Sequence, residues 1–248
     1  MTELENAVPF SAIDPLGRVK FSVLLGMFQE MADVDALRFG LSISQIIDRN
    51  ITWVLHKYRV VLDKYPTKES GSLTINTYAE PHRNLYSLRS FKIKDSRGEF
   101  IGSAYTWWVL LDIEKQRPMR LDKNIFSENF AACCKENPYV TNEPVGKIAS
   151  ITEPDIIEPF KVRWQELDVN GHTNNIVYFD WALDTVPDDV TEKLSPHFVE
   201  AEFIHSVPRT RVRCLTQEIP DESGRTFLHS LRHSDDETEY ARLYSKWR

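Results

Sequence analysis

The chain is short of cysteine, of long apolar runs and of positive charge. Its three cysteines, Cys133, Cys134 and Cys214, are an odd and low count in 248 residues, which argues against a disulfide framework. No stretch approaches the ~18 consecutive apolar residues of a membrane-spanning helix, and the opening MTELENAVPF lacks the pattern of a signal peptide. The formal net charge of −7 argues against nucleic acid as the main partner. We therefore expect a cytoplasmic protein without a membrane span or a nucleic-acid partner.

Composition and length are those of an ordinary globular protein with room for two small domains. The chain is 42% hydrophobic and 27% charged, and at roughly 100–150 residues per domain it can form two small domains or one large one. Three short matches between its halves favour two: residues 14–17 (DPLG) with 168–171 (DVNG), 85–89 (LYSLR) with 228–232 (LHSLR), and 105–108 (YTWW) with 244–247 (YSKW). Because the matches keep the same order, we expect one fold written twice in tandem.

Each copy is expected to contain one helix followed by a run of strands. Apolar residues at three- and four-residue steps predict helices over residues 22–39 and 174–185, the second ended by Pro187. The stripes that should face the core are Leu24, Met27, Phe28, Met31, Val34 and Leu37 in the first helix, and Val177, Trp181 and Asp184, with Tyr178 and Ala182 adjoining, in the second. Runs rich in aromatic and β-branched residues predict four strands per copy, at 52–62, 72–79, 85–94, 100–112, 198–206, 210–218, 226–233 and 239–248.

One helix covered by an antiparallel sheet is an α+β layout. We place the first domain at residues 1–126 and the second at residues 159–248. The stretch between them, residues 127–158, carries several prolines and little periodicity, so we expect it to be a linker along the surface.

A polar cluster sets the second copy apart from the first. At the matched turns, the second copy has Asn170 where the first has Leu16, and His172 where the first has Arg18. Asp168 and the glycine of the turn have counterparts in the first copy, which suits a shared turn. The comparison indicates that the second copy holds a working site and the first a degenerate one.

Three residues of this cluster, Asp168, Asn170 and His172, alternate along a segment that is extended or turning, so all three can face one pocket. They lie just before a helix N-terminus, near Asn174, where free N–H groups and the helix dipole favour a developing negative charge. An imidazole, an amide, a carboxylate and an oxyanion site are the parts of acyl-transfer or hydrolytic chemistry. The alternative is that Asp168 and Asn174 cap a turn and a helix, and that His172 is a surface residue.

Residues 166–181 (ELDVNGHTNNIVYFDW) resemble the active-site segment of acyl-acyl carrier protein thioesterases, whose pattern is Asp-x-Asn-x-His-x-x-Asn followed by an aromatic residue and Trp. Residues 10–32 (FSAIDPLGRVKFSVLLGMFQEMA) look like the opening of that family, and residues 103–112 (SAYTWWVLLD) look like its strand with paired Trp. The resemblance covers nearly the whole chain. It implies a tandem double-hotdog fold, in which each half is a long helix wrapped by an antiparallel sheet.

The resemblance also implies an activity, the hydrolysis of fatty acyl thioesters on acyl carrier protein with release of free fatty acid. It gives catalytic roles to Asp168, Asn170 and His172, and it implies neither a metal nor an organic cofactor. In the mechanism we favour, His172 and Asn170 act on the attacking water and the carbonyl, and Asp168 orients them. Amides at the helix N-terminus would hold the oxyanion.

The sequence departs from the family at one position. The family usually carries a Glu on the first long strand after the second helix, and here the matching run is residues 203–207 (FIHSV), with Ser206 at the place of the Glu. Glu202 would share a strand face with Ser206, but four residues of strand separate them by ~13 Å. Ser206 then either positions the water through its hydroxyl, or is not needed beside the other three residues, or leaves the activity weakened or lost.

Further polar residues are candidates for binding or catalytic groups. Alternation of Arg209, Arg211 and Arg213 predicts one strand face, which is either a solvated surface or a basic strip for a phosphopantetheine phosphate or an acidic carrier protein. We name Asn174, Arg209 and Arg211 as candidate substrate-binding residues. Cys214 is expected to be a plain half-buried thiol. His229 and His233 lie ~13 Å apart if they share a strand, so no metal site is expected.

Two other functions remain open from the sequence. An acyl-CoA thioesterase of the 4-hydroxybenzoyl-CoA type would use Asp168 itself as base or nucleophile, and residues 178–181 look similar to the helix of that family. A non-catalytic acyl-binding hotdog protein would explain the missing Glu. The expected partner is acyl carrier protein, through its acyl-phosphopantetheine thioester, or acyl-CoA. The chain is expected to be a monomer or a homodimer.

Overall fold

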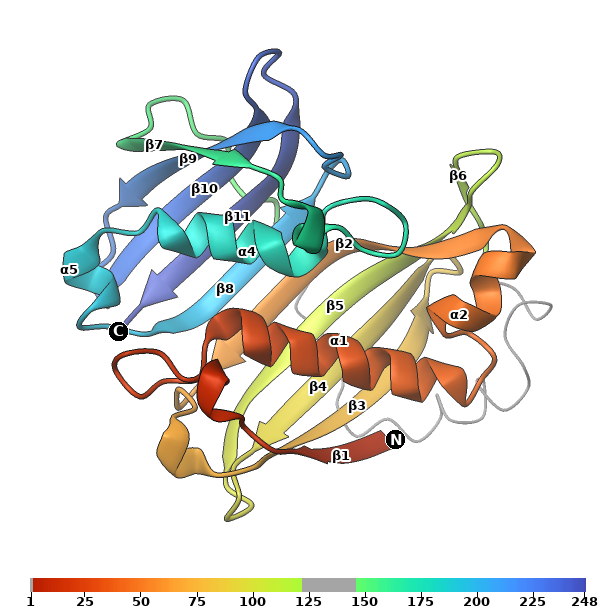
Figure 1. The fold of residues 1–248 in the computed structure, drawn as a ribbon, viewed down its shortest axis with the longest axis horizontal. Coiled ribbons are helices and arrows are strands. Elements are labelled where there is room, and N and C mark those ends of the chain that lie inside the picture. The colour runs from red at the N-terminus through yellow and green to blue at the C-terminus, as the bar shows by residue number, and fades with distance from the viewer. Residues whose placement is uncertain (1, 122–145) are drawn as a thin grey trace. The chain divides into compact units, whose positions relative to one another are not determined.

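The chain forms two compact units with the same internal order of elements. A computed structural model describes residues 2–121 and 146–248, and Figure 1 shows the helices and strands. Unit 1 comprises residues 1–57 and 66–144, and unit 2 comprises residues 58–65 and 145–248. Across the described residues, no helix is long and apolar enough to span a bilayer.

Unit 1 is a helix laid across one face of an antiparallel sheet (Figure 1). Its elements are β1 (Thr2–Asn6), η1 (Phe10–Ala12), α1 (Phe21–Leu37), α2 (Ile43–Ile46), η2 (Ile47–Arg49), β2 (Ile51–Leu62), η3 (Lys68–Ser70), β3 (Leu73–His82), β4 (Tyr86–Lys94), β5 (Phe100–Asp112) and β6 (Arg117–Pro118). The strand order is β1-β3-β4-β5-β2, with β6 paired to β5. The boundary between the units falls inside β2, after Lys57.

Unit 2 repeats this plan. Its elements are β7 (Ile156–Lys161), η5 (Trp164–Glu166), α4 (Asn175–Asp184), α5 (Asp188–Thr191), β8 (Pro196–Phe203), β9 (Arg211–Ile219), β10 (Arg225–His233) and β11 (Glu239–Trp247). The strand order β7-β9-β10-β11-β8 matches that of unit 1 element for element, with α4 in the place of α1. The expected α+β fold, one helix and one antiparallel sheet in each half, is confirmed.

The eight expected strands all occur, with each end within three residues of its expected position. The sequence did not indicate the short edge strands β1 and β7. Their residues are mostly exposed, so they carry too little of the apolar alternation by which a strand is recognised.

Structural equivalence is clearest at the last long strand of each unit, β5 in unit 1 and β11 in unit 2. The indole N–H of Trp108 donates to the hydroxyl of Thr106 at 2.8 Å, and the indole N–H of Trp247 donates to the hydroxyl of Ser245 at 3.0 Å. The match between residues 105–108 and 244–247 is therefore a true structural correspondence.

The second of the three sequence matches is out of register. Ser87 lies opposite Trp108, and Arg225 lies opposite Trp247, so these two residues correspond. Residues 85–89 are therefore equivalent to the start of β10, not to residues 228–232. Similar alternation of apolar and polar residues recurs every two positions along any half-buried strand, so a short match does not define register.

The buried faces of both helices differ in part from the expected stripes. In α1, Val34 and Leu37 are 43% and 52% exposed, whereas Asp35 is buried. Asp35 turns inward because its carboxylate accepts from the buried guanidinium of Arg89 at 2.7 Å, and a buried ion pair satisfies both charges. In α4, Asp184 lies at the surface, and the buried residues are Tyr178, Phe179, Trp181 and Ala182.

The expected linker is shorter on its C-terminal side than the sequence suggested. Residues 127–145 of it, with Cys133 and Cys134, lie outside the described residues. Residues 146–158 belong to unit 2, and β7 begins within them at Ile156. The interpretation missed this because one proline and little periodicity do not reveal a segment that is fixed by contacts with distant strands.

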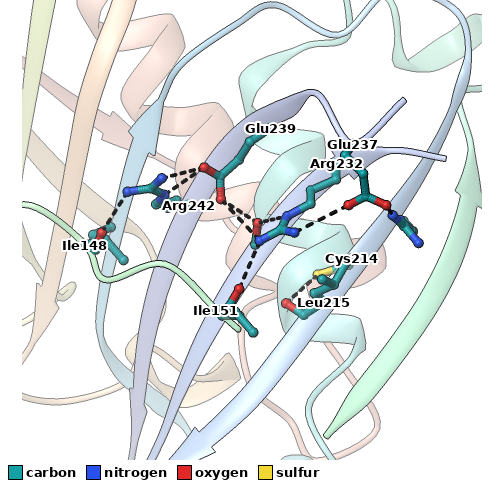
Figure 2. Close-up of polar contacts among 10 residues, drawn as sticks. Ile148, Ile151, Cys214, Leu215, Arg232, Glu237, Glu239 and Arg242 are labelled. Carbon is teal, nitrogen blue, oxygen red and sulfur yellow. Dashed lines mark hydrogen bonds and ion pairs between the residues drawn. The ribbon is translucent and has the colours of Figure 1, made fainter. Parts of the chain in front are cut away.

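Residues 146–151, here called the strap, are held on the sheet of unit 2 (Figure 2). Ile148 and Ile151 are buried in a cluster with Leu215 and Leu228. Two arginines of the sheet donate to strap carbonyls: Arg232 Nη2 to the Ile151 oxygen at 3.0 Å, and Arg242 Nη1 to the Ile148 oxygen at 3.3 Å. Glu239 accepts from Arg242 at 2.6 Å, which fixes that guanidinium on the sheet. The strap is thus part of the folded unit.

We expect Ile151→Ala to lower the free energy of unfolding by about 2–4 kcal/mol, because a buried Ile loses its contacts and leaves a cavity. Ile151 is 3% exposed, whereas Ile157, on the edge strand β7, is 53% exposed. The matched control Ile157→Ala should therefore cost less than about 1 kcal/mol. Urea unfolding followed by circular dichroism measures both. Equal and small losses would mean that the strap does not contribute to the core.

Candidate active site

The turn that precedes α4 is built around one carboxylate. The Asp168 Oδ1 atom accepts from the backbone N–H of Asn170 at 2.8 Å and of His172 at 3.1 Å. The Asp168 N–H donates to the His172 carbonyl at 2.7 Å, and the Gly171 N–H donates to the Asp168 carbonyl at 3.0 Å. Gly171 has a φ of 75°, which glycine adopts without strain. The carboxylate thereby fixes the backbone of both neighbouring polar residues.

The first copy builds the same turn with different side chains. The Asp14 Oδ1 atom accepts from the N–H groups of Leu16 at 2.9 Å and Arg18 at 2.8 Å, and Gly17 has a φ of 78°. The second oxygen of Asp14 is taken by the Arg18 Nε at 2.6 Å. In this copy the turn is closed by an ion pair and offers no proton-transfer group.

In the second copy the corresponding atom, Oδ2 of Asp168, here called the outer oxygen, has no arginine partner in the described part of the chain and accepts one long hydrogen bond. Among the described residues, the Asn170 amide at 3.5 Å is its one hydrogen-bond partner. Asn170 and His172 are exposed, and Asp168 is half-buried. The structure therefore places an imidazole, an amide and a carboxylate on one turn, with the side chains of Asn170 and His172 exposed to solvent.

Asn174 is the N-cap of α4, and its side chain is used for that cap. Its Oδ1 accepts from the Ile176 N–H at 3.0 Å, and its carbonyl accepts from the Val177 N–H at 3.0 Å. Among the described residues the Asn175 N–H has no acceptor, so it is the amide of the first turn that stays available for an anionic group. The capping alternative considered for Asn174 is the one that the structure adopts for its side chain.

Ser206 lies in a loop and not on a strand, because β8 ends at Phe203. The ladder stops where the Ile204 and His205 N–H groups both turn to the Tyr240 carbonyl. The argument from a strand face shared by residues 202 and 206 therefore does not apply. Ser206 is exposed, and within the described residues no hydrogen bond joins its hydroxyl to the turn of Asp168. A backbone hydrogen bond joins the loop of Ser206 to the residue that follows His172: the Thr173 N–H donates to the Val207 carbonyl at 2.9 Å.

The three arginines do not form one strand face. Arg209 precedes β9, which begins at Arg211, and Arg213 forms an ion pair with Glu237. Arg213 is thereby neutralised. Arg209 and Arg211 have different neighbours.

Arg209 lies just before β9, Arg211 begins that strand, and Lys161 ends β7; these three cations are here called the basic patch. The guanidinium of Arg209 lies 5.6 Å from the ring centroid of Trp164, which is 69% exposed. Arg211 lies opposite Lys161 in the pairing of β7 with β9. Within the described part of the chain, none of these three cations has a carboxylate within 4.0 Å. Trp164 begins η5, which leads directly into the turn of Asp168.

The remaining candidates are structural. Cys214 is fully buried, and burial raises the pKa of its thiol to about 12, so it is not a nucleophile near neutral pH. His229 is buried and lies 2.9 Å from the hydroxyls of both Thr216 and Ser245; burial lowers its pKa to about 3. The described residues include no group of three His, Cys, Asp or Glu side chains placed to hold a metal ion.

Sequence reasoning missed two residues that the structure places beside the turn. The guanidinium of Arg209 lies over the ring of Trp164, and the hydroxyl of Tyr178 accepts from the Val207 N–H at 2.9 Å. The helical spacing predicts Tyr178 only as a residue adjoining the stripe that faces the core. Comparison of the two copies would have found it, because the residue at the same distance after the helix cap in α1 is Leu24.

Comparison with known proteins decides the family. The acyl-ACP thioesterase N-terminal domain matches residues 2–129, and the acyl-ACP thioesterase C-terminal domain matches residues 149–248, where ACP is acyl carrier protein. The chain belongs to the acyl-ACP thioesterase family. The resemblance drawn from residues 166–181 is therefore confirmed.

Two plant proteins of this family are similar to the chain in sequence. The chain is 25% identical over 227 residues to the chloroplastic oleoyl-acyl carrier protein thioesterase 2 of Arabidopsis thaliana, covering 80% of this chain and 62% of that protein. It is 26% identical over 210 residues to the chloroplastic palmitoyl-acyl carrier protein thioesterase of Cuphea hookeriana, covering 82% of this chain and 50% of that protein. The chain thus spans less than two thirds of the length of these relatives.

Solved structures share the fold over the whole chain. The 12:0-ACP thioesterase from Umbellularia californica superposes with a TM-score of 0.88 at 22% identity, covering 100% of this chain and 93% of that one. An acyl-ACP thioesterase from Bacteroides thetaiotaomicron gives a TM-score of 0.84 at 20% identity, covering 100% and 97%. The double-hotdog fold expected for this chain is confirmed.

The two matched turns predict different results for the same substitution. Asp168→Asn keeps a carbonyl oxygen for the backbone N–H groups but removes the charge beside His172, so thioester hydrolysis should fall at least ~10-fold in kcat. Asp14→Asn removes the partner of Arg18 and should lower stability by up to about 1 kcal/mol, with kcat unchanged. Steady-state hydrolysis and thermal unfolding of both variants measure this. Equal kinetic losses with unchanged stability would contradict the assignment of one working turn.

Proposed function

We propose that this chain hydrolyses fatty acyl thioesters carried on acyl carrier protein and releases the free fatty acid. The observation that carries the proposal is the comparison of the two turns. Both hold an Asp and a Gly in the same backbone geometry, but only unit 2 adds Asn170 and His172 and leaves the outer oxygen of Asp168 without an arginine. Membership of the acyl-ACP thioesterase family supports the choice of thioester as substrate.

His172 is the proton-transfer group in the proposed reaction. A water oxygen bonds to the thioester carbonyl carbon while the imidazole takes the water proton, and the carbonyl π electrons move onto oxygen. When the carbonyl forms again, the carbon–sulfur bond breaks with its electron pair on sulfur. The imidazolium then gives its proton to the thiolate. The products are the free fatty acid and the thiol of the carrier.

Asn170 and a helix amide serve the oxyanion. The Asn170 amide lies on the same turn as His172, and the Asn175 N–H points out of the first turn of α4 without an acceptor among the described residues. Donors of this kind, aimed where negative charge develops, lower the barrier of acyl transfer. Asp168 keeps both catalytic residues in place through the bonds to their N–H groups, and its charge stabilises the imidazolium.

Ser206 is proposed to hold the attacking water. It replaces the family Glu, and the Thr173–Val207 backbone bond keeps its loop beside the turn of His172. A neutral hydroxyl cannot act as a strong base, so the reaction depends on His172 for proton transfer. This role, the cytoplasmic location and the state as monomer or homodimer stay predictions.

Acyl carrier protein is proposed to dock on the basic patch of Lys161, Arg209 and Arg211. A chain with a net charge of −7 needs a local positive surface to bind an acidic carrier protein. Trp164 adds an exposed aromatic face beside the guanidinium of Arg209. The patch leads into the catalytic turn through η5, so a docked carrier would deliver its thioester to that turn.

We expect His172→Ala to lower kcat at least ~100-fold, because a positioned acid–base group contributes about that much. The fold should be retained, since His172 is exposed and its hydrogen bonds are made by its backbone. Hydrolysis of acyl-ACP, acyl-CoA and an acyl N-acetylcysteamine ester by wild type and variant tests the proposal. Normal turnover by a folded variant would remove His172 from the mechanism, and a wild type active on acyl-CoA alone would favour the acyl-CoA thioesterase.

Charge reversal in the patch should act on binding and not on chemistry. Arg211→Glu should raise the KM for acyl-ACP about 10-fold and leave hydrolysis of the uncharged acyl N-acetylcysteamine ester unchanged. Lys193→Glu is the matched control, because Lys193 is an exposed cation of the same unit and gives the same change in net charge. A similar rise in KM from both variants would show a general charge effect, and the docking site would then lie elsewhere.

A further inference from the structure

The peptide of Val207 is held from both sides. Its N–H donates to the hydroxyl of Tyr178 at 2.9 Å, and its carbonyl accepts from the Thr173 N–H at 2.9 Å. Tyr178 lies on α4 and Thr173 follows His172, so one residue joins the helix, the loop of Ser206 and the catalytic turn. Val207 is fully buried, and its N–H would have no water to turn to if the tyrosine hydroxyl were removed.

The first copy keeps one of these bonds and lacks the other. The Val19 N–H donates to the Pro66 carbonyl at 2.9 Å, which makes Pro66 the counterpart of Val207. Leu24, four residues after the cap of α1, is the counterpart of Tyr178. Leucine has no hydroxyl and proline has no N–H, so the donor and the acceptor are absent together. The link is present in the unit that carries the imidazole and absent in the unit that does not.

Burial and packing restrict the ring of Tyr178 to one position. It is 1% exposed and packs against Phe203 and Trp181, with ring centroids 5.3 Å and 6.0 Å away. Burial raises the pKa of its hydroxyl by more than the hydrogen bond from the Val207 N–H lowers it, and the Asp168 carboxylate adds a smaller upward effect. The hydroxyl therefore keeps its proton and does not act as a base.

We propose that Tyr178 is a positioning residue for the reaction: through Val207 it fixes the loop of Ser206 against the turn that carries His172. This inference rests on the proposed function. The loop has a second anchor, since the Ile204 and His205 N–H groups both donate to the Tyr240 carbonyl. With Val207 fixed as well, Ser206 sits between two anchored points, and the water it holds keeps one position relative to the imidazole.

Tyr178→Phe tests the role, since it removes the hydroxyl and keeps the ring. We expect kcat for acyl-ACP to fall about 10-fold with the KM within 2-fold, because the residues that bind the carrier are unchanged. The matched control is Tyr58→Phe: Tyr58 is another buried tyrosine of unit 2, it packs against Phe179 at 5.4 Å, and no described residue bonds to its hydroxyl. Tyr58→Phe should leave kcat unchanged.

Two further measurements separate positioning from stability. Rates are taken at a temperature at which circular dichroism shows each variant folded, so that a lower Tm alone cannot reduce kcat. Exchange of the Val207 amide with deuterium, followed by NMR, should be at least 10-fold faster in Tyr178→Phe and unchanged in Tyr58→Phe. If the single variant does not fold, Tyr178→Leu with Val207→Pro copies the arrangement of unit 1, leaves no donor stranded, and should show the same loss of kcat.

The results distinguish this inference from the function on which it rests. A wild-type protein that hydrolyses no thioester would overturn both. A wild type that is active, together with a folded Tyr178 variant whose kcat lies within 2-fold of it, would overturn the role of Tyr178 alone.

Discussion

The hydrogen bonds that an Asp carboxylate accepts at each turn are the interaction on which the turn and the start of the following helix depend. In both units one oxygen of an Asp accepts from two backbone N–H groups of the next four residues. Bonds from N–H groups to an ionised acceptor are shorter and stronger than those between neutral groups, so the turn is rigid. The helix begins immediately after it, and the direction of entry and the positions of the intervening side chains follow from this one arrangement.

The duplication shows how little must change for a shared scaffold to differ in chemistry. Arg18 closes the first turn with an ion pair, whereas the second has an imidazole at the same place. The polar groups under the helices differ as well. Unit 1 buries the ion pair of Asp35 with Arg89, and unit 2 buries a neutral network around His229. Both of these networks form within their own unit, so the exposed turn could change while these buried groups kept their partners.

Order in the site also depends on a residue that touches no reacting atom. The loop of Ser206 follows the end of β8 and contains no regular structure, so its position relies on single hydrogen bonds. Val207 supplies two of them, one to the helix and one to the turn. Loops carry catalytic groups well only when a rigid scaffold fixes them, and Tyr178 provides that link in unit 2.

The sequence alone was sufficient for the two long helices, the main strands, the family and the turn of Asp168, Asn170 and His172. These depend on local spacing, since the turn closes within four residues and an amphipathic pattern repeats every few residues. Tertiary structure alone decided the register of β10, the place of the strap, the loop position of Ser206 and the bond from Val207 to Tyr178. Each joins segments far apart in the chain, and no local pattern records which partner a buried N–H or isoleucine will meet.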